Sequence, residues 1–280
     1  MAERHAPAIG PHGSASDRPT PCALPHEGPM SARFQTPPEV RAVWEECIGD
    51  PRYREMAHHR GVGKFRDDDV WLAIGRQTRA RLRAALRVHR PAVAAAFDRH
   101  DPRRGPFFAG AALEWGPGGG SNVLALAPYV RDYYGVDVSG PTLAEASRQA
   151  EAAGITSFRP VHLDGEPEDI VQRIDRPVEL VVSTAVFQHF PSAAYGRRVL
   201  RTMHAVTRPG SLGLVQIRYD DGKPRFRPKS GDYREQFITY TSYRLDAFAS
   251  DLMDAGFRVL DIHVTNPGIN YAFYVFDRTN

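Results

Sequence analysis

The sequence predicts an α/β protein with a doubly wound, mostly parallel sheet, and two observations lead to that prediction. Strand-like apolar runs alternate with helical segments from about residue 106 onward, a pattern typical of parallel strands with helices on both faces. The first apolar run, Ala111 to Leu113, also leads directly into a glycine-rich turn. At such a turn the bare main chain lets a ligand approach closely.

The glycine-rich turn covers residues 114–120, with the sequence EWGPGGG. Glu114, Gly116, Gly118 and Gly120 take alternate positions in it. We expect a helix over 122–129, whose N-terminal N–H groups would point toward a ligand held by the turn. Glycine turns also serve purely structural ends, so the interpretation depends on the order of the motifs downstream of the turn.

The next strands end in residues that carry chemistry. A strand over 133–137 ends in Asp137, and a strand over 158–163 is followed directly by Asp164; a strand over 178–184 runs on to His189. In open α/β sheets ligands bind outside the carboxyl ends of the strands, so these side chains should meet there. A carboxylate at the second strand's end can accept hydrogen bonds from both hydroxyls of a ribose. We further expect helices over 141–153, 192–206 and 244–255 and a strand over 211–218.

In this order the motifs resemble those of the class I S-adenosylmethionine-dependent methyltransferases, over about residues 108–277. The matching features are the acid-and-glycine turn, Gly135-Val136-Asp137, the end of the strand at Asp164, the segment 186–191 (VFQHFP) and the turn 208–210 (RPG). The resemblance implies a seven-stranded sheet whose last strand is antiparallel, with 256–264 and 270–277 as the final hairpin. Trp115, Pro117 and Glu179 depart from the residues usual in the family.

The resemblance also implies roles for individual residues. Gly116, Gly118 and Gly120 would cradle the methionine part of S-adenosylmethionine, and Glu114 would support that turn or meet the amino group. Asp137 would bind the ribose and Asp164 the adenine amine. The remaining residues of the predicted cofactor site lie beside these at the strand ends: Val138, Gly165 and Ser183.

A nicotinamide dehydrogenase is the competing interpretation, because that fold also pairs a glycine turn with an acid after the second strand. Its Gly-x-Gly-x-x-Gly spacing would require glycine at 121 or at 123. Ser121 and Val123 stand there. A cofactor-binding fold without catalysis is the third interpretation.

Two regions flank the core domain. Residues 1–36, rich in Pro, Gly, Ser and His, should form a disordered tail. We expect helices over 37–48 and 68–88. The family resemblance implies that residues 37–105 form a helical lid over cofactor and substrate and that residues 106–280 form the methyltransferase domain. Residues 219–243 should be an insertion at the rim of the sheet. Its aromatic residues either offer surface to an apolar or aromatic substrate or pack the insertion onto the core: Phe226, Tyr233, Phe237, Tyr240 and Tyr243.

Composition limits the class of protein. No run approaches the ~20 apolar residues of a membrane helix, and the N-terminus has no apolar signal-peptide core. We therefore expect a cytoplasmic protein that does not associate with a membrane. Cys22 and Cys47 are the only cysteines, which leaves no readable metal site. A row of arginines at helical spacing, from Arg76 to Arg90, favours a solvated face over a polyanion site, although an RNA or protein methyltransferase using this face stays an alternative.

The substrate should be a small molecule. The strand end Val182-Ser183-Thr184 is not the Asn/Asp-Pro-Pro segment used for planar amines, and the core domain has no cysteine for attack on a pyrimidine. We therefore expect methyl transfer to an O or N atom, in keeping with specialised bacterial metabolism. His189 is the predicted general base, because its ordinary pKa near 6.5 suits proton removal. It could equally serve only to hydrogen-bond the start of a helix. Tyr195, Arg218 and Asn270 are weaker candidates for orienting substrate.

Overall fold

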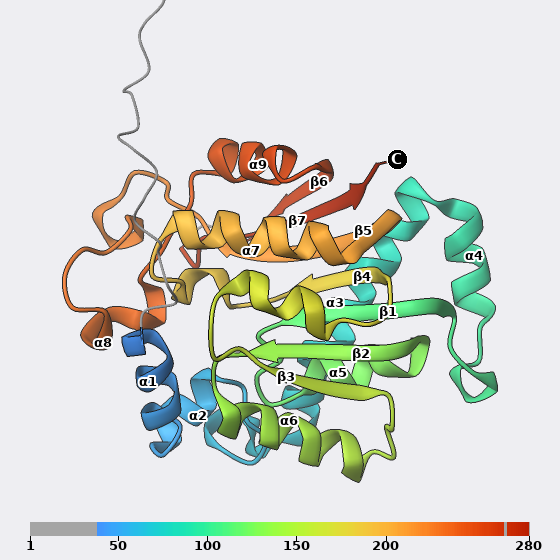
Figure 1. Ribbon diagram of the computed structural model, residues 1–280, viewed down its shortest axis with the longest axis horizontal. Helices are drawn as coiled ribbons and strands as arrows, with labels where there is room; N and C mark the ends of the chain where they lie inside the picture. The colour runs from blue at the N-terminus through green and yellow to red at the C-terminus, as the bar shows by residue number, and fades with distance from the viewer. Residues whose placement is uncertain (1–37, 266–267, 280) are drawn as a thin grey trace, which may run out of the picture. The chain divides into compact units, whose positions relative to one another are not determined.

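The computed structural model describes residues 38–265 and 268–279, and these form a sheet flanked by helices (Figure 1). The strands follow the order β3-β2-β1-β4-β5-β7-β6. β1 through β5 pair in parallel, whereas β7 runs antiparallel to both of its neighbours. The strand bounds are β1 Phe108–Trp115, β2 Val130–Asp137, β3 Phe158–His162, β4 Val178–Ser183, β5 Thr207–Arg218, β6 Phe257–Val264 and β7 Tyr271–Arg278.

The predicted doubly wound sheet with an antiparallel last strand is confirmed. The α-helices are α1 Pro38–Cys47, α2 Pro51–Met56, α3 Asp68–His89, α4 Pro91–Arg99, α5 Ser121–Leu126, α6 Gly140–Ala152, α7 Ala193–Val206, α8 Tyr233–Gln236 and α9 Leu245–Asp254. The predicted tail, 1–36, lies outside the described residues.

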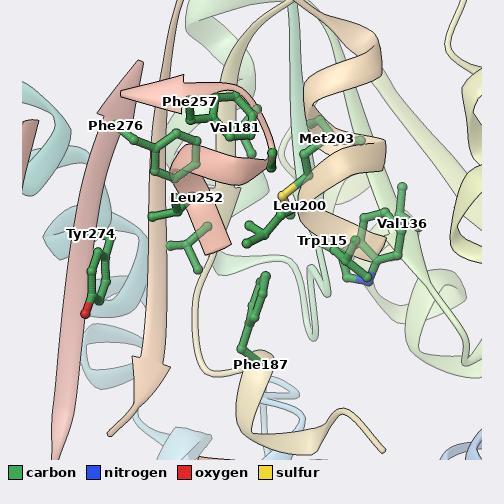
Figure 2. Packing of buried hydrophobic residues seen from close by; sticks show 14 of the residues in the cluster. Trp115, Val136, Val181, Phe187, Leu200, Met203, Leu252, Phe257, Tyr274 and Phe276 are labelled. Carbon is green, nitrogen blue, oxygen red and sulfur yellow. The ribbon is translucent and has the colours of Figure 1, made fainter. Parts of the chain in front are cut away.

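Alternation along the strands divides the core between the two faces of the sheet. In β1, Leu113 packs with the cluster under α7 and α9, while its neighbour Ala112 packs with the cluster under α3 to α6. Figure 2 shows part of the first cluster, where Leu200 and Met203 of α7 lie close to Leu252 of α9. The result is a sheet that is buried on both sides, so only its edges and ends can carry a binding site.

Two differences from the prediction concern where elements begin. β2 begins at Val130, earlier than the predicted 133, because the helix after the glycine turn ends at Leu126 and only a 3-10 turn, Ala127–Tyr129, comes after it. α4 was not predicted at all. Pro91 occupies its first turn, a favourable position for proline, and Ala94 is buried against the sheet layer.

Helix α3 belongs to the packed layer on the sheet. The N–H of Gly75 donates to Ser121 Oγ at 3.0 Å, and that hydroxyl donates to the Trp71 carbonyl at 2.8 Å. A Cβ at position 75 would lie 2.2 Å from the Ser121 carbonyl oxygen, so the two helices touch through backbone. This contact fixes α3 against α5, the helix that comes after the glycine turn.

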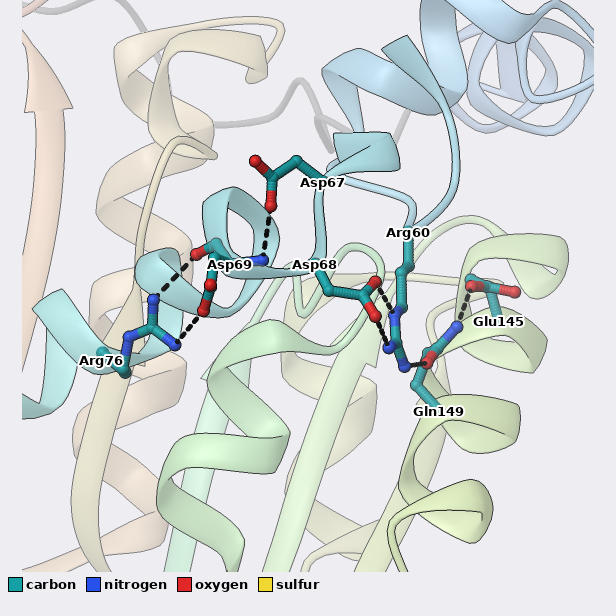
Figure 3. A network of polar contacts seen from close by, with 7 residues as sticks. All are labelled: Arg60, Asp67, Asp68, Asp69, Arg76, Glu145 and Gln149. Atoms are coloured by element: carbon teal, nitrogen blue, oxygen red, sulfur yellow. Dashed lines mark hydrogen bonds and ion pairs between the residues drawn. The ribbon is translucent and has the colours of Figure 1, made fainter. Parts of the chain in front are cut away.

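The segment between α2 and α3, residues 57–67, is held at both ends. Arg60 forms an ion pair with Asp68 at the start of α3 and donates to the Gln149 side chain of α6 at 3.2 Å (Figure 3). An N-cap begins α3, where Asp67 accepts from the Asp69 N–H at 2.9 Å. Residues 57–67 therefore bridge α3 and α6 across the glycine turn.

Within the described part of the chain, no helix is both long and apolar enough to cross a membrane. Nor do the described residues contain a group of three or more His, Cys, Asp or Glu side chains placed to hold a metal ion.

Candidate active site

A pocket lies at the carboxyl ends of β1, β2 and β4. Its walls come from the sheet ends and from two segments outside the sheet, α1 with residues 56–58, and residues 184–195 after β4. The lining residues are Val40, Trp44, Met56, Ala57, His58, Trp115, Gly116, Gly118, Val136, Asp137, Val138, Thr142, Thr184, Ala185, Val186, His189, Phe190, Pro191 and Tyr195.

The glycine turn forms the floor of this pocket. Gly116, Gly118 and Gly120 have φ angles of +74°, +52° and +92°, a region that residues with a Cβ rarely adopt. Gly116 and Gly118 line the pocket, whereas Gly120 lies behind them against Ala146 of α6. The alternate glycines therefore shape the backbone at the end of β1, as the motif predicts.

Glu114 supports the turn from beneath. Its side chain is fully buried and accepts hydrogen bonds from Asn122 Nδ2 at 2.6 Å and from the Tyr133 hydroxyl at 2.8 Å. Burial raises the pKa of Glu114 to about 7, and the two hydrogen bonds only partly oppose that shift. Of the two roles that the resemblance offers for this residue, its contacts correspond to the structural one.

Asp137 ends β2 and lines the pocket together with Val138. One carboxylate oxygen accepts the Ser139 N–H at 2.9 Å. Burial raises the pKa of Asp137 to about 6, while the backbone hydrogen bonds and the nearby His162 lower it in part. The group therefore changes charge just below neutral pH.

Three other predicted cofactor residues do not line the pocket. Ser183 is buried and donates to the Trp115 carbonyl at 3.0 Å, which ties β4 to the end of β1. Asp164 is exposed, and its carbonyl accepts from Arg41 of α1 at 2.6 Å; Gly165 is next in the chain. These residues stand at the strand ends that the sequence indicates, but their roles toward a cofactor stay predictions.

Thr142 is a pocket residue that the sequence analysis missed. Its hydroxyl is buried and has no hydrogen-bond partner among the described residues. A buried hydroxyl without a partner is costly, and a bound ligand with polar groups would satisfy it. Its position in the first turn of α6, five residues after Asp137, was the available signal.

His189 lines the other end of the pocket and is held from two sides. Its Nδ1 lies 3.2 Å from the Phe237 carbonyl oxygen of the rim insertion, and its ring meets the Trp44 ring of α1 edge-on at 5.0 Å. Burial lowers the pKa of His189 to about 4, although the carbonyls of Phe237, Ala185 and Ile238 raise it in part. The imidazole is therefore neutral at pH 7.

The aromatic residues of the rim insertion pack inward. Tyr233 and Phe237 form a cluster with Val40 and Val43 of α1, and Phe226 and Tyr243 are also buried. None of the five predicted rim aromatics lines the pocket. Its aromatic surface comes instead from Trp44, Trp115, Phe190 and Tyr195, residues that the sequence analysis did not associate with substrate, apart from Tyr195.

Arg218 and Asn270 are occupied elsewhere. The buried Arg218 guanidinium donates to Ser242 Oγ and to the carbonyls of Arg225 and Phe226 inside the insertion. Asn270 hydrogen-bonds the Tyr219 carbonyl at 3.4 Å. Both side chains hold the insertion in place, and neither lines the pocket.

Comparisons with known proteins give the same assignment as the motifs. Residues 113–215 match the family model Methyltransf_11, described as a methyltransferase domain. No curated protein matches the chain. Among solved structures, magnesium protoporphyrin IX methyltransferase from Synechocystis PCC 6803 with bound SAH is similar at 14% identity and a TM-score of 0.57, over 85% of this chain and 100% of that one.

A second structure of the Synechocystis enzyme, with bound SAM, is similar at 15% identity and a TM-score of 0.54, over 86% of this chain and 97% of that one. The N-methyltransferase NodS from Bradyrhizobium japonicum WM9 has a TM-score of 0.47 at 15% identity, over 61% and 80% of the two chains. At these identities, the likeness to the Synechocystis enzyme shows a shared fold.

Residues 113–215 thus match a methyltransferase domain model, and the sheet has the fold of the class I S-adenosylmethionine-dependent methyltransferases. The cofactor of that class is S-adenosylmethionine, as the motifs predict. Two features of the pocket fit such a cofactor. Glycine backbone lies open at the end of β1, and the buried Thr142 hydroxyl is available to a polar group of the ligand.

Proposed function

We propose that this protein transfers a methyl group from S-adenosylmethionine to an oxygen or nitrogen atom of a small molecule. The observation that carries the proposal is the position of His189, a neutral imidazole held in the same pocket as Asp137 and the glycine turn. The cofactor supplies an electrophilic methyl group on a good leaving group. The protein then has to hold the acceptor atom close and in line within a site that excludes water.

The two ends of the pocket divide this work. Asp137 would accept hydrogen bonds from the ribose hydroxyls, and Gly116 and Gly118 would lie against the methionine part. Asp164 would meet the adenine amine from the exposed end of β3. The cofactor's reactive carbon would then lie toward His189 and the aromatic wall.

His189 would remove the proton of the acceptor. With Nδ1 donating to the Phe237 carbonyl, the lone pair of the neutral ring is on Nε2. Burial keeps the imidazole unprotonated at neutral pH, so its lone pair is open to the acceptor's proton as the oxygen or nitrogen becomes the nucleophile; the lowered pKa also makes His189 a weaker base than an ordinary imidazole with a pKa near 6.5.

The lining indicates the kind of acceptor. Val40, Trp44, Met56, Phe190 and Pro191 form an apolar and aromatic wall, and no Lys or Arg is among the described residues that line the pocket. Such a wall favours an uncharged apolar or aromatic small molecule. A role in specialised bacterial metabolism fits such a substrate.

A role on RNA or protein is less well supported, because the arginine row of α3 is largely neutralised. Of Arg76, Arg79, Arg83, Arg87 and Arg90, only Arg79 lacks a carboxylate partner among the described residues. The partners of the other four are Asp69, Asp98 (shared by Arg83 and Arg87) and Asp277.

The proposal is tested by isothermal titration with S-adenosylmethionine and, separately, with NADH, and then by an acceptor screen for S-adenosylhomocysteine release. Micromolar binding of S-adenosylmethionine with turnover of at least one small molecule is the expected result. Binding of NADH alone would overturn the proposal. Binding of S-adenosylmethionine without turnover on any acceptor class would favour a non-catalytic cofactor-binding fold.

A further inference from the structure

The methionine part of S-adenosylmethionine ends in a carboxylate, and the pocket must provide it with a donor. No lysine or arginine is among the described residues that line the pocket. Glu114 is buried under the turn and is an acid, so it cannot serve. The lining side chains that can donate near the glycine turn therefore become the candidates.

His58 is the candidate that lies on the glycine turn itself. Ala57, the residue before His58, accepts a hydrogen bond at its carbonyl from the Gly119 N–H at 2.9 Å. A Cβ at Gly118 would lie 3.8 Å from the His58 Cβ, and a Cβ at Gly119 would lie 2.2 Å from the His58 carbonyl oxygen. The other lining histidine, His189, lies beyond β4 and is held by the rim insertion.

The His58 ring has nothing else to bind in the described part of the chain. Neither of its nitrogens has a hydrogen-bond partner among the described residues, and its contacts are an edge-on approach to Phe65 at 5.3 Å and the pocket itself. Burial, together with the positive charge of Lys64 and the neighbouring His189 and His59, lowers the pKa of His58 to about 4. A neutral imidazole keeps one N–H donor, and a nearby carboxylate favours its charged form.

The backbone at His58 is strained, and surrounding contacts maintain the strain. Its φ is +57°, in the left-handed region that residues with a Cβ rarely adopt. The His58 carbonyl accepts the Trp71 indole N–H at 2.7 Å, and the Ala57 carbonyl accepts from the glycine turn. Strain kept by such contacts is typical of binding and catalytic sites.

We propose that His58 binds the carboxylate of the cofactor's methionine part. This inference rests on the proposed function, since it assigns one more contact within the same cofactor site. It places the N-terminal segment, rather than the sheet, as the source of selectivity for the amino-acid end of the cofactor.

The test combines a substitution with a truncated ligand. Affinities of the full chain are measured by isothermal titration for S-adenosylhomocysteine and for its decarboxylated analogue, which keeps the amine, the sulfur and the adenosine. His58→Asn and His58→Gly both tolerate a positive φ, so the backbone is preserved. His204→Asn is the matched control, a histidine of α7 that does not line the pocket.

We expect both His58 variants to bind S-adenosylhomocysteine at least about tenfold more weakly than the wild type, which is the loss of a hydrogen bond to a charged group. The decarboxylated analogue should bind all proteins within about twofold, and His204→Asn should leave both affinities nearly unchanged. An equal loss for both ligands, or no loss for either, would overturn the assignment while leaving the proposed function standing. Failure of the wild type to bind S-adenosylhomocysteine would overturn the proposed function itself.

Discussion

The two ends of the pocket are built in different ways. The cofactor end consists of strand ends, the glycine turn and Asp137, which belong to the buried sheet. The acceptor end consists of side chains from α1 and the segment after β4, supported by the rim insertion. One end is thus set by main-chain geometry and the other by the packing of aromatic side chains from distant parts of the sequence.

His189 lies where side chains of α1 and the rim insertion pack against each other. The Trp44 indole N–H lies 3.3 Å from the Tyr233 hydroxyl oxygen, and that hydroxyl donates to the His189 carbonyl at 2.6 Å. An ion pair between Glu46 and Arg234 links the same two regions at the surface. The predicted base therefore keeps its orientation only while α1 and the insertion stay together. Substitutions at the acceptor end should accordingly impair turnover, and substitutions at the cofactor end should impair cofactor affinity.

The largest effect is expected at the acceptor end. His189→Asn should lower kcat about 10²- to 10⁴-fold on an acceptor found by the screen, because the variant cannot take up the acceptor's proton. The measurement is kcat alongside the dissociation constant of S-adenosylhomocysteine, which should change little. His204→Asn, a histidine of α7 that does not line the pocket, is the control. A fully active His189→Asn protein would reduce His189 to a structural residue.

At the cofactor end, Asp137→Asn should weaken S-adenosylhomocysteine about 100-fold or more, through the loss of two charge-assisted hydrogen bonds. The fold should survive. Because the pKa of Asp137 is raised in the folded state, its ionisation lowers stability as pH rises through about 6, so the variant should melt no lower than the wild type at pH 8.

Asp132→Asn provides the comparison for Asp137→Asn within the same strand. Asp132 is buried at the far end of β2 and pairs with Arg176 at 2.5 Å and with Arg159 at 3.1 Å. We expect the reverse pattern there, a loss of thermal stability with unchanged affinity. Wild-type affinity in Asp137→Asn would refute the placement of the ribose.

The pH dependence of cofactor binding should be governed by Asp137. A carboxylate accepts two hydrogen bonds that its protonated form accepts poorly, so affinity for S-adenosylhomocysteine should be constant above about pH 7 and fall by up to tenfold per unit below about pH 6. Titrations between pH 5 and 8 check this. Asp137→Asn should flatten the curve, and a curve of the same shape in the variant would assign the titration to another group.

The smallest effect concerns the contact between the glycine turn and residues 57–59. Gly119→Ala should destabilise the protein by about 1–3 kcal/mol, because the new Cβ would overlap the His58 carbonyl oxygen. Thermal unfolding gives the magnitude. At Gly140 the nearest atom to a new Cβ is 4.0 Å away, so Gly140→Ala should be nearly neutral. Equal melting temperatures for both variants would show that residues 57–59 move to accommodate the new Cβ without a loss of stability.

The cofactor end was largely predictable from sequence, because local patterns determine it. A glycine turn after β1 and an acid at the end of β2 are properties of single segments, and the structure has both where the sequence indicates them. The fold could be inferred from the same local alternation of elements.

The acceptor end was less predictable, because it depends on contacts across long sequence separations. Trp44 precedes the glycine turn in the sequence and His189 follows it, yet their rings are in contact. No pattern within either segment indicates that contact. The aromatic residues of the insertion were recognised as a group, but whether they faced the pocket or the core depended on α1, against which Tyr233 and Phe237 pack. His58 and Thr142 were missed because a histidine or threonine beside a turn has no distinctive spacing.

The joint support of His189 by α1 and the insertion bears on how such enzymes could be recombined. A chimera that exchanges residues 219–243 alone would keep the native Trp44 against an unmatched residue in place of Phe237, so the packing beside His189 would change. Exchanging α1 and the insertion as a pair would carry the matched interface along and leave the strand ends untouched. For engineering new acceptors, these two stretches form a single transferable cassette, although the whole cofactor end is encoded between them in the gene.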